Sequence, residues 1–172
     1  MISKEQIQRV HALGRKWNVT DPVKQHAKMG EELGEYLEAK DQLSTRKREK
    51  MKSEMGDMWF TLILLCNQIE VDFLELYKGA LGHDIEPFET DNQFIKIACG
   101  MHFELGGDLL KNRISRRQIS YLIRCWLNEC ATKFISPAEA LESVLIKNEN
   151  KAGKTVNGTF IKEQDLNNNH GK

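Results

Sequence analysis

The chain has 172 residues, and its 25 Lys and Arg residues balance its 25 Asp and Glu residues, so the formal net charge is zero. A general nucleic-acid-binding protein needs a surplus of Lys and Arg to displace counterions, and the balanced charge argues against that class. The longest apolar run, residues 59–66, is far shorter than the roughly 20 residues of a membrane span. We therefore expect a cytoplasmic protein that binds neither nucleic acid polymers nor membranes.

Apolar residues recur at three- and four-residue spacing along most of the chain, which predicts an all-α bundle of about six to seven helices. The expected helices cover about 4–16, 21–43, 44–70, 72–82, 94–109, 119–130 and 137–148. Residues 1–150 then form one all-α domain, in which a helix pair at about 21–70 precedes additional helices at about 88–150. Residues 151–172 are expected to form a C-terminal tail.

Capping residues set the expected helix boundaries. Asp before Pro is a favourable helix start, and Ser or Asp followed three residues later by Glu is typical of a capping box. Such signals occur at Asp21-Pro22, Ser44-Thr45, Asp72 and Ser136-Pro137. In the tail, Asn157-Gly158 between two short segments predicts a hairpin, and residues 167–172 are expected to fray.

The four cysteines lie at positions 66, 99, 125 and 130, without a Cys-x-x-Cys pair or a histidine at ligand spacing. We interpret them as inert thiols of the core, with Cys66, Cys99 and Cys130 on apolar helical faces. Trp59 is likewise interpreted as a core residue. His26 and His102 have no partner ligands at helical spacing, and we interpret them as surface or satisfied core residues.

The same acidic pattern occurs on two of the expected helices. Residues 32–35 read Glu-Leu-Gly-Glu and residues 54–57 read Glu-Met-Gly-Asp, and a Met precedes each first acid by three residues. The two acids of each pair lie one turn apart on the same helix face, beside the apolar stripe. If the helices pack antiparallel, the four acids converge at the seam between them.

Four carboxylates at a partly buried seam repel one another, and a hard divalent cation relieves that repulsion. This predicts a metal site for Mg²⁺, with Mn²⁺ as a substitute. A glycine inside a helix costs about 1 kcal/mol relative to Ala, so the equivalent positions of Gly34 and Gly56 indicate close approach of a helix or a ligand. The alternative interpretation is a pair of amphipathic helices with acidic, solvated faces.

The acidic pattern resembles the signature of the MazG-type all-α nucleoside triphosphate pyrophosphohydrolases, which is Glu-Glu-x-x-Glu followed, after a spacer, by Glu-x-x-Asp. These motifs occupy residues 31–35 and 54–57, with eighteen residues between them. The resemblance covers about residues 21–82. A weaker similarity to the tails of phage and bacterial MazG-like proteins covers 147–151 and 158–162. The same superfamily includes the dimeric dUTPases and dCTPases.

The resemblance implies Mg²⁺-dependent hydrolysis of a (d)NTP to the (d)NMP and pyrophosphate by metal-activated water, in a homodimer or homotetramer. By position in the motifs, the implied metal ligands, which are also catalytic residues, are Glu32, Glu35, Glu54 and Asp57. Glu31 completes the implied catalytic set as a residue that orients or activates water, and a solvent-facing role for it is the alternative.

Three residues are candidates for binding the substrate. Lys28 lies one turn before Glu32 and can reach the opening of the same site, and a solvated lysine on the helix face is the alternative. Asn148 and Lys151 enter through the similarity of the tail, and both are also explained as residues at a helix end. Arg and Lys residues elsewhere, such as those at 46–52, are interpreted as solvated.

Two other functions stay open from the sequence. One is a pyrimidine-specific enzyme of the dUTPase or dCTPase type, and the other is a non-catalytic helical module for nucleotide binding or protein interaction. Residues 88–133 match no motif of the family. They are expected to supply further bundle helices, to cover the substrate pocket, or to replace a partner subunit.

Overall fold

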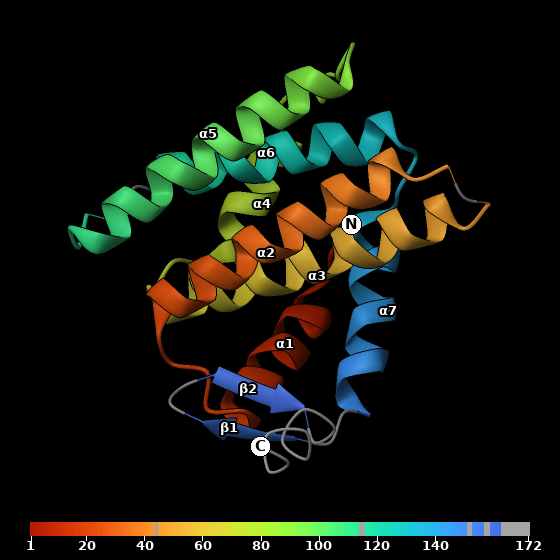
Figure 1. Ribbon diagram of the computed structural model, residues 1–172. Helices are drawn as coiled ribbons and strands as arrows, with labels where there is room; N and C mark the ends of the chain where they lie inside the picture. Colours follow the sequence, from red (N-terminus) through yellow and green to blue (C-terminus); the bar gives the residue numbers. More distant parts are fainter. Residues whose placement is uncertain (44, 114–115, 151–152, 157–158, 163–172) are drawn as a thin grey trace, which may run out of the picture.

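The computed structural model describes residues 1–43, 45–113, 116–150, 153–156 and 159–162. Within these residues the chain forms seven helices, and the predicted all-α bundle is confirmed (Figure 1). The helices are α1 (Lys4–Lys16), α2 (Pro22–Asp41), α3 (Lys47–Gln68), α4 (Phe73–Leu81), α5 (Asp91–Leu110), α6 (Arg116–Thr132) and α7 (Pro137–Glu149). Strands β1 (Gly153–Val156) and β2 (Thr159–Lys162) pair antiparallel as the predicted hairpin. The expected fraying of residues 167–172 lies outside the described residues.

Three of the four predicted capping signals act as expected. The side chain of Asp21 accepts hydrogen bonds from the backbone N–H groups of Val23 and Lys24, with Pro22 in the first turn of α2. The side chains of Asp72 and Ser136 each accept from the backbone N–H group three residues on, at the starts of α4 and α7. Each bond satisfies a donor that has no partner within its own helix.

The predicted start of α3 at Ser44-Thr45 is wrong. Ser44 lies outside the described residues and Thr45 lies in a turn, while α3 begins at Lys47 without a side-chain cap. Tertiary contacts hold the first two turns of α3 instead. Arg48 donates a hydrogen bond to the carbonyl oxygen of Phe134 at 3.0 Å, and Lys52 pairs with Glu139 at 3.0 Å. Contacts with the segment around α7 therefore replace the local capping signal.

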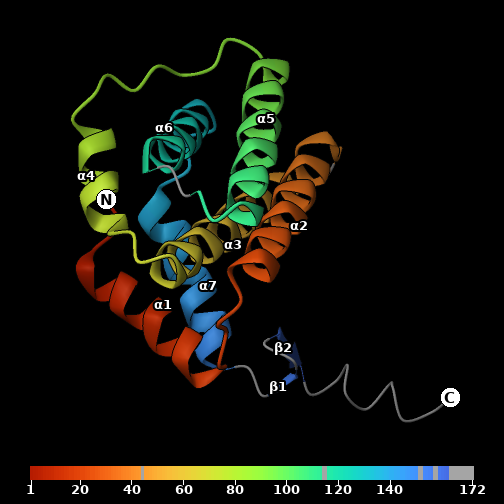
Figure 2. The same cartoon turned by 90° about the vertical axis from the view of Figure 1, so that its left-hand side faces the viewer.

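The antiparallel pair α2 and α3 forms the centre of the bundle (Figures 1 and 2). Helices α1 and α7 pack against α3, α5 packs against α2 and α6, and α4 packs against α6. Trp59 of α3 is fully buried and makes edge-to-face contacts with Trp126, Tyr77 and Phe73, which confirms it as a core residue. In the described part of the chain, no helix is long and apolar enough to cross a membrane.

Residues 88–133 supply two more helices to the bundle, α5 and α6, and a buried polar network joins them to α2. The ammonium group of Lys40 and the hydroxyl group of Tyr36 both donate to one carboxylate oxygen of Glu129, each at 2.7 Å. Lys40 also pairs with Asp91 at 3.0 Å. Lys40 and Glu129 are both buried, so each charge offsets the cost of withdrawing the other from water.

The interpretation of the cysteines as core thiols is confirmed for three of them. Cys66, Cys125 and Cys130 are buried, and burial raises the pKa of each thiol to about 12, so that all three stay protonated. Cys99 is exposed, and its assignment to the core is wrong. It follows the fully buried Ala98 on α5, and one residue turns a helix by about 100°, which carries Cys99 away from the buried stripe.

Candidate metal centre

Three carboxylates from two helices meet at the seam between α2 and α3. Glu32, Glu54 and Asp57 each offer one oxygen, and these oxygens lie within 4.8 Å of one another. The antiparallel packing of the pair brings the two acidic patterns to the same level. The side chain of Glu32 is 7% exposed and that of Asp57 is 13% exposed. The structure therefore brings together three of the four predicted metal ligands in a place that is largely withdrawn from water.

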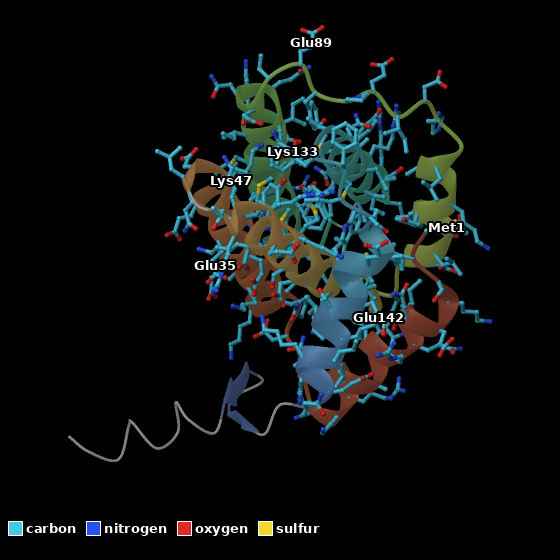
Figure 3. The ribbon with its side chains drawn as sticks, turned by 90° about the vertical axis from the view of Figure 1, so that its right-hand side faces the viewer. Met1, Glu35, Lys47, Glu89, Lys133 and Glu142 are labelled. Carbon is cyan, nitrogen blue, oxygen red and sulfur yellow. The ribbon has the colours of Figure 1, made fainter. Side chains whose placement is uncertain are left out.

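The fourth predicted ligand, Glu35, borders this cluster. Its side chain is exposed at the surface of the α2–α3 pair (Figure 3). Three residues turn a helix by about 300°, so Glu35 is displaced from Glu32 around α2 by about 60°. It remains close enough to Glu54 to help raise the pKa of that carboxyl group. Glu35 thus lies at the solvent edge of the site, outside the set of three convergent oxygens.

The cluster holds its carboxylates at an electrostatic cost. Burial, followed by the charges of Asp57, Glu35 and Glu32, raises the pKa of Glu54 to about 7. Burial also raises the pKa of Glu32, although the ion pair with Lys28 acts in the opposite direction. Near neutral pH the site therefore has a strong tendency to take up a proton or a cation.

Two lysines already lie against the cluster, one from each side. The ammonium group of Lys28 lies 2.8 Å from a carboxylate oxygen of Glu31 and 2.8 Å from one of Glu32. Burial acts to lower the pKa of Lys28, but these two ion pairs raise it above its ordinary value. On the other side, the ammonium group of Lys147 lies 3.3 Å from a carboxylate oxygen of Asp57. Both lysines are about half exposed, so either can also face a ligand in solvent.

Lys147 is the site residue that the prediction missed. It is the first residue of the tail segment 147–151, whose similarity to the family pointed to Asn148 and Lys151 instead. Its place beside Asp57 depends on the packing of α7 against α3, across ninety residues of chain. The local sequence pattern contains no information about that contact.

Two other predicted site residues, Glu31 and Asn148, are not among the three convergent carboxylates. Glu31 is 57% exposed and pairs with Lys28, which agrees with the solvent-facing alternative for this residue. Asn148 is 2% exposed and lies in the last turn of α7 with its side chain buried, while the C-cap residue of this helix is Asn150. Its side-chain oxygen is buried and has no hydrogen-bond partner among the described residues. Lys151 lies outside the described residues.

The two equivalent glycines have different surroundings. A Cβ atom added to Gly56 would lie 2.3 Å from the carbonyl oxygen of Ala140 and 2.8 Å from a methyl group of Val144, both on α7. Gly56 therefore allows the close helix approach that its position predicts, and this approach brings Lys147 to Asp57. A Cβ atom added to Gly34 would meet nothing within 4 Å, so no helix packs closely there.

A buried polar contact fixes the register of α2 against α3. The side-chain amide of Gln25 donates to the carbonyl oxygen of Thr61 at 3.2 Å, and both residues are buried. Gln25 lies seven residues before Glu32, and Thr61 lies seven residues after Glu54, so this contact and the acids share one register. The acceptor is a backbone carbonyl, and the hydroxyl group of Thr61 donates within its own helix, so no side chain of α3 signals this contact in the sequence.

The donor set fits a hard divalent cation. All three convergent side chains offer carboxylate oxygens, which Mg²⁺ and Mn²⁺ prefer. Two oxygens on one Mg²⁺ ion lie at most about 4.2 Å apart, and the oxygens of the cluster are already within 4.8 Å of one another. A bound cation would also remove the mutual repulsion that raises the pKa of Glu54.

No family model, curated protein or solved structure matches this chain. The resemblance to the MazG-type enzymes therefore rests on the acidic motifs and their spacing. What the structure adds is the meeting of those motifs at one seam, together with a lysine on each side.

Proposed function

We propose that this protein is a Mg²⁺-dependent nucleoside triphosphate pyrophosphohydrolase, which converts a (d)NTP to the (d)NMP and pyrophosphate. The observation that carries the proposal is the convergence of Glu32, Glu54 and Asp57 within 4.8 Å at the α2–α3 seam. The spacing of the motifs and the flanking lysines support it. Bound there, the cation would neutralise phosphate charge and lower the pKa of water, so that no covalent nucleophile is needed.

The residues of the chain divide the remaining tasks by position. Glu32, Glu54 and Asp57 hold the cation. Glu35, which is exposed at the open edge of the cluster, would accept the proton of the attacking water. Lys28 and Lys147, which pair with carboxylates of the cluster, would instead face the phosphate oxygens of the substrate once those carboxylates serve as metal ligands.

The test is turnover of a panel of canonical and modified nucleoside triphosphates with Mg²⁺ or Mn²⁺. We expect the monophosphate and pyrophosphate as products, and loss of turnover in Glu54→Gln. Glu38→Gln is the matched control, since Glu38 is an exposed acid on α2, one turn beyond Glu35 and outside the acidic motif. Unchanged turnover in Glu54→Gln, or products other than monophosphate and pyrophosphate, would contradict the proposal. The same panel separates a general enzyme from a pyrimidine-specific enzyme of the dUTPase or dCTPase type.

A second function, a non-catalytic helical module, is favoured by the ion pairs of the cluster. Lys28 and Lys147 each neutralise one of its carboxylates, so two of the three convergent carboxylate charges are compensated without a metal. Calorimetric titration with Mg²⁺ and a non-hydrolysable nucleotide, read together with the turnover panel, discriminates between the two functions: binding without turnover of the hydrolysable nucleotides indicates the module, and binding with turnover indicates the enzyme. The expected homodimer or homotetramer is a separate prediction, measured by light scattering after size exclusion.

A further inference from the structure

A histidine from α2 and a histidine from α5 stack on each other where these helices cross. The rings of His26 and His102 are nearly parallel, with an interplanar angle of 7° and a centroid separation of 3.9 Å. A ring nitrogen of His26, Nε2, lies 2.9 Å from the backbone carbonyl oxygen of His102. A carbonyl oxygen only accepts, so Nε2 of His26 carries the proton and donates. Both rings are partly buried.

Each ring fits against a glycine of the opposite helix. A Cβ atom added to Gly30 of α2 would lie 2.6 Å from Nε2 of His102, and one added to Gly106 of α5 would lie 2.6 Å from Cε1 of His26. The two helices thus use the same arrangement reciprocally, a histidine followed four residues later by a glycine. Only glycine leaves room for the opposing ring, so this geometry joins α5 to α2 at close range.

The contact is compatible only with neutral rings. Burial lowers the pKa of both histidines, and the charge of His26 lowers that of His102 further, to about 4. The buried Nδ1 atom of His102 has no hydrogen-bond partner among the described residues, so a proton added there would have no acceptor. Two imidazolium rings at this separation would also repel each other strongly.

Within the part of the chain that the structure describes, no acid near either ring compensates for a charge on it. Among the described residues of α2, α3, α5 and α6, no carboxylate shifts the pKa of His26 or His102. The charged residues within one turn are Lys24 and Lys28 on α2 and Glu104 on α5. Lys24 pairs with Asp21, Lys28 pairs with Glu31 and Glu32, and Glu104 is exposed. A protonated ring would therefore remain without a counter-charge.

We propose that the stacked histidines are an acid-sensitive contact, which holds the C-terminal half of α5 against α2 while both rings are neutral and releases it when a ring is protonated. The N-terminal half of α5 has other attachments to α2. Asp91 pairs with Lys40, and Phe94 makes an edge-to-face contact with Tyr36. The released segment is thus residues 101–110, while residues 91–98 stay in place. This device is independent of the metal site.

Amide hydrogen exchange, corrected for the intrinsic effect of pH on the exchange rate, tests the proposal. Between pH 7 and pH 4.5 we expect the protection of residues 101–110 to fall at least tenfold, while the protection of residues 91–98 changes little. The double variant His26→Gln and His102→Gln cannot gain a charge, and the side-chain amide introduced at position 26 can still donate to the same carbonyl. It should lose this pH dependence, whereas exposed His83→Gln should keep it. Equal pH dependence in the wild type and the double variant would overturn the proposal.

A second pair of variants covers the case in which the double variant does not fold. Gly106→Ala would push the ring of His26 aside, so residues 101–110 should be unprotected already at pH 7. Gly100→Ala on the same helix meets nothing within 4 Å and should leave the protection intact. NMR titration of the wild-type histidines provides an independent readout. If both rings titrate near pH 6.5 while residues 101–110 stay protected at pH 4.5, the contact is not acid-sensitive.

Discussion

The acidic motifs of α2 and α3 have nearly the same sequence but different surroundings. On α3, Gly56 lies against α7, and Asp57 is 13% exposed with Lys147 beside it. On α2, Gly34 has nothing within 4 Å and Glu35 is exposed. One further helix, α7, accounts for the difference because it packs on only one of the two motifs. The second acid of the repeated motif is therefore largely covered in the α3 half and open to solvent in the α2 half, whereas the first acids, Glu32 and Glu54, both belong to the convergent set.

The largest difference between the two halves is expected in catalysis. Glu54→Gln removes an oxygen ligand from the convergent set, and we expect kcat/KM to fall by about 1000-fold. Glu35→Gln removes a carboxylate outside that set, and a loss of about 10- to 100-fold is expected for a proton acceptor that water can partly replace. Pyrophosphate release under saturating Mg²⁺ measures both variants. Equal losses would show that the halves are functionally equivalent in spite of their different burial.

The two glycines give the next largest effect, this time on stability. Gly56→Ala forces a Cβ atom against the backbone of Ala140, and we expect the free energy of unfolding to fall by about 3 kcal/mol. Gly34→Ala has open space and gains helix propensity, so it should raise the same quantity by up to about 1 kcal/mol. Urea unfolding monitored by circular dichroism measures both. If both substitutions lower the free energy of unfolding alike, the inference that α7 makes the two glycine positions different is wrong.

Much of this arrangement follows from local sequence. The apolar period predicts the helices, the caps at Asp21 and Ser136 predict where α2 and α7 begin, and the acidic spacing predicts which carboxylates share a face. These features depend on residues within a few turns of one another. The short connection between α2 and α3 predicts that they pack antiparallel, and this packing predicts that Glu32 lies close to Glu54.

The remaining features depend on contacts between segments distant in the chain. The start of α3 is set by Arg48 reaching Phe134, and the partner of Asp57 is set by Lys147 of α7. The histidine pair lies across seventy-six residues. No period or motif in one helix specifies which other helix will cover it. For that reason the sequence predicts four equivalent carboxylates, whereas the structure has three that converge and one at the edge.

The ionisation of Glu54 should make the stability of the protein depend on pH by about 1 kcal/mol, whereas the exposed Glu35 should contribute less. The pKa of Glu54 is raised to about 7 from an ordinary value of 4.5, so the folded protein binds more protons than the unfolded chain between these values. This contribution to stability is full below pH 4.5 and is lost as the pH rises through 7. Glu54 is only half-buried, so solvent screening reduces the effect to about 1 kcal/mol.

Glu54→Gln should therefore be more stable than the wild type at pH 8 and similar to it at pH 5, both without divalent cations. The histidine pair acts with the opposite sign at acid pH, but it is present in both proteins and cancels in the difference. Thermal unfolding at the two pH values measures the effect. Glu35→Gln is the control, and a smaller gain is expected because its carboxylate is exposed.

The smallest effect is expected on metal affinity, from the two lysines that form ion pairs with the carboxylates when no cation is bound. Lys28 makes two contacts of 2.8 Å, including one to the nearly buried Glu32, whereas Lys147 makes a single contact of 3.3 Å to Asp57. A divalent cation must displace both, so Lys28→Met and Lys147→Met should each tighten Mn²⁺ binding. Ion pairs of partly exposed groups are worth up to about 1 kcal/mol, which sets the gain at no more than about fivefold. The gain should be larger for Lys28→Met.

Hydrolysis should change in the opposite direction, since the same lysines face the phosphate groups once the cation is bound. Each variant is therefore expected to bind Mn²⁺ more tightly, measured by electron paramagnetic resonance, and to show a higher KM for the nucleotide. Lys24→Met is the matched control, because Lys24 lies one turn before Lys28 and pairs with Asp21 outside the cluster. Tighter metal binding with an unchanged KM would mean that the lysines only neutralise the empty site. Weaker metal binding would mean that they hold the carboxylates in the geometry that the cation requires.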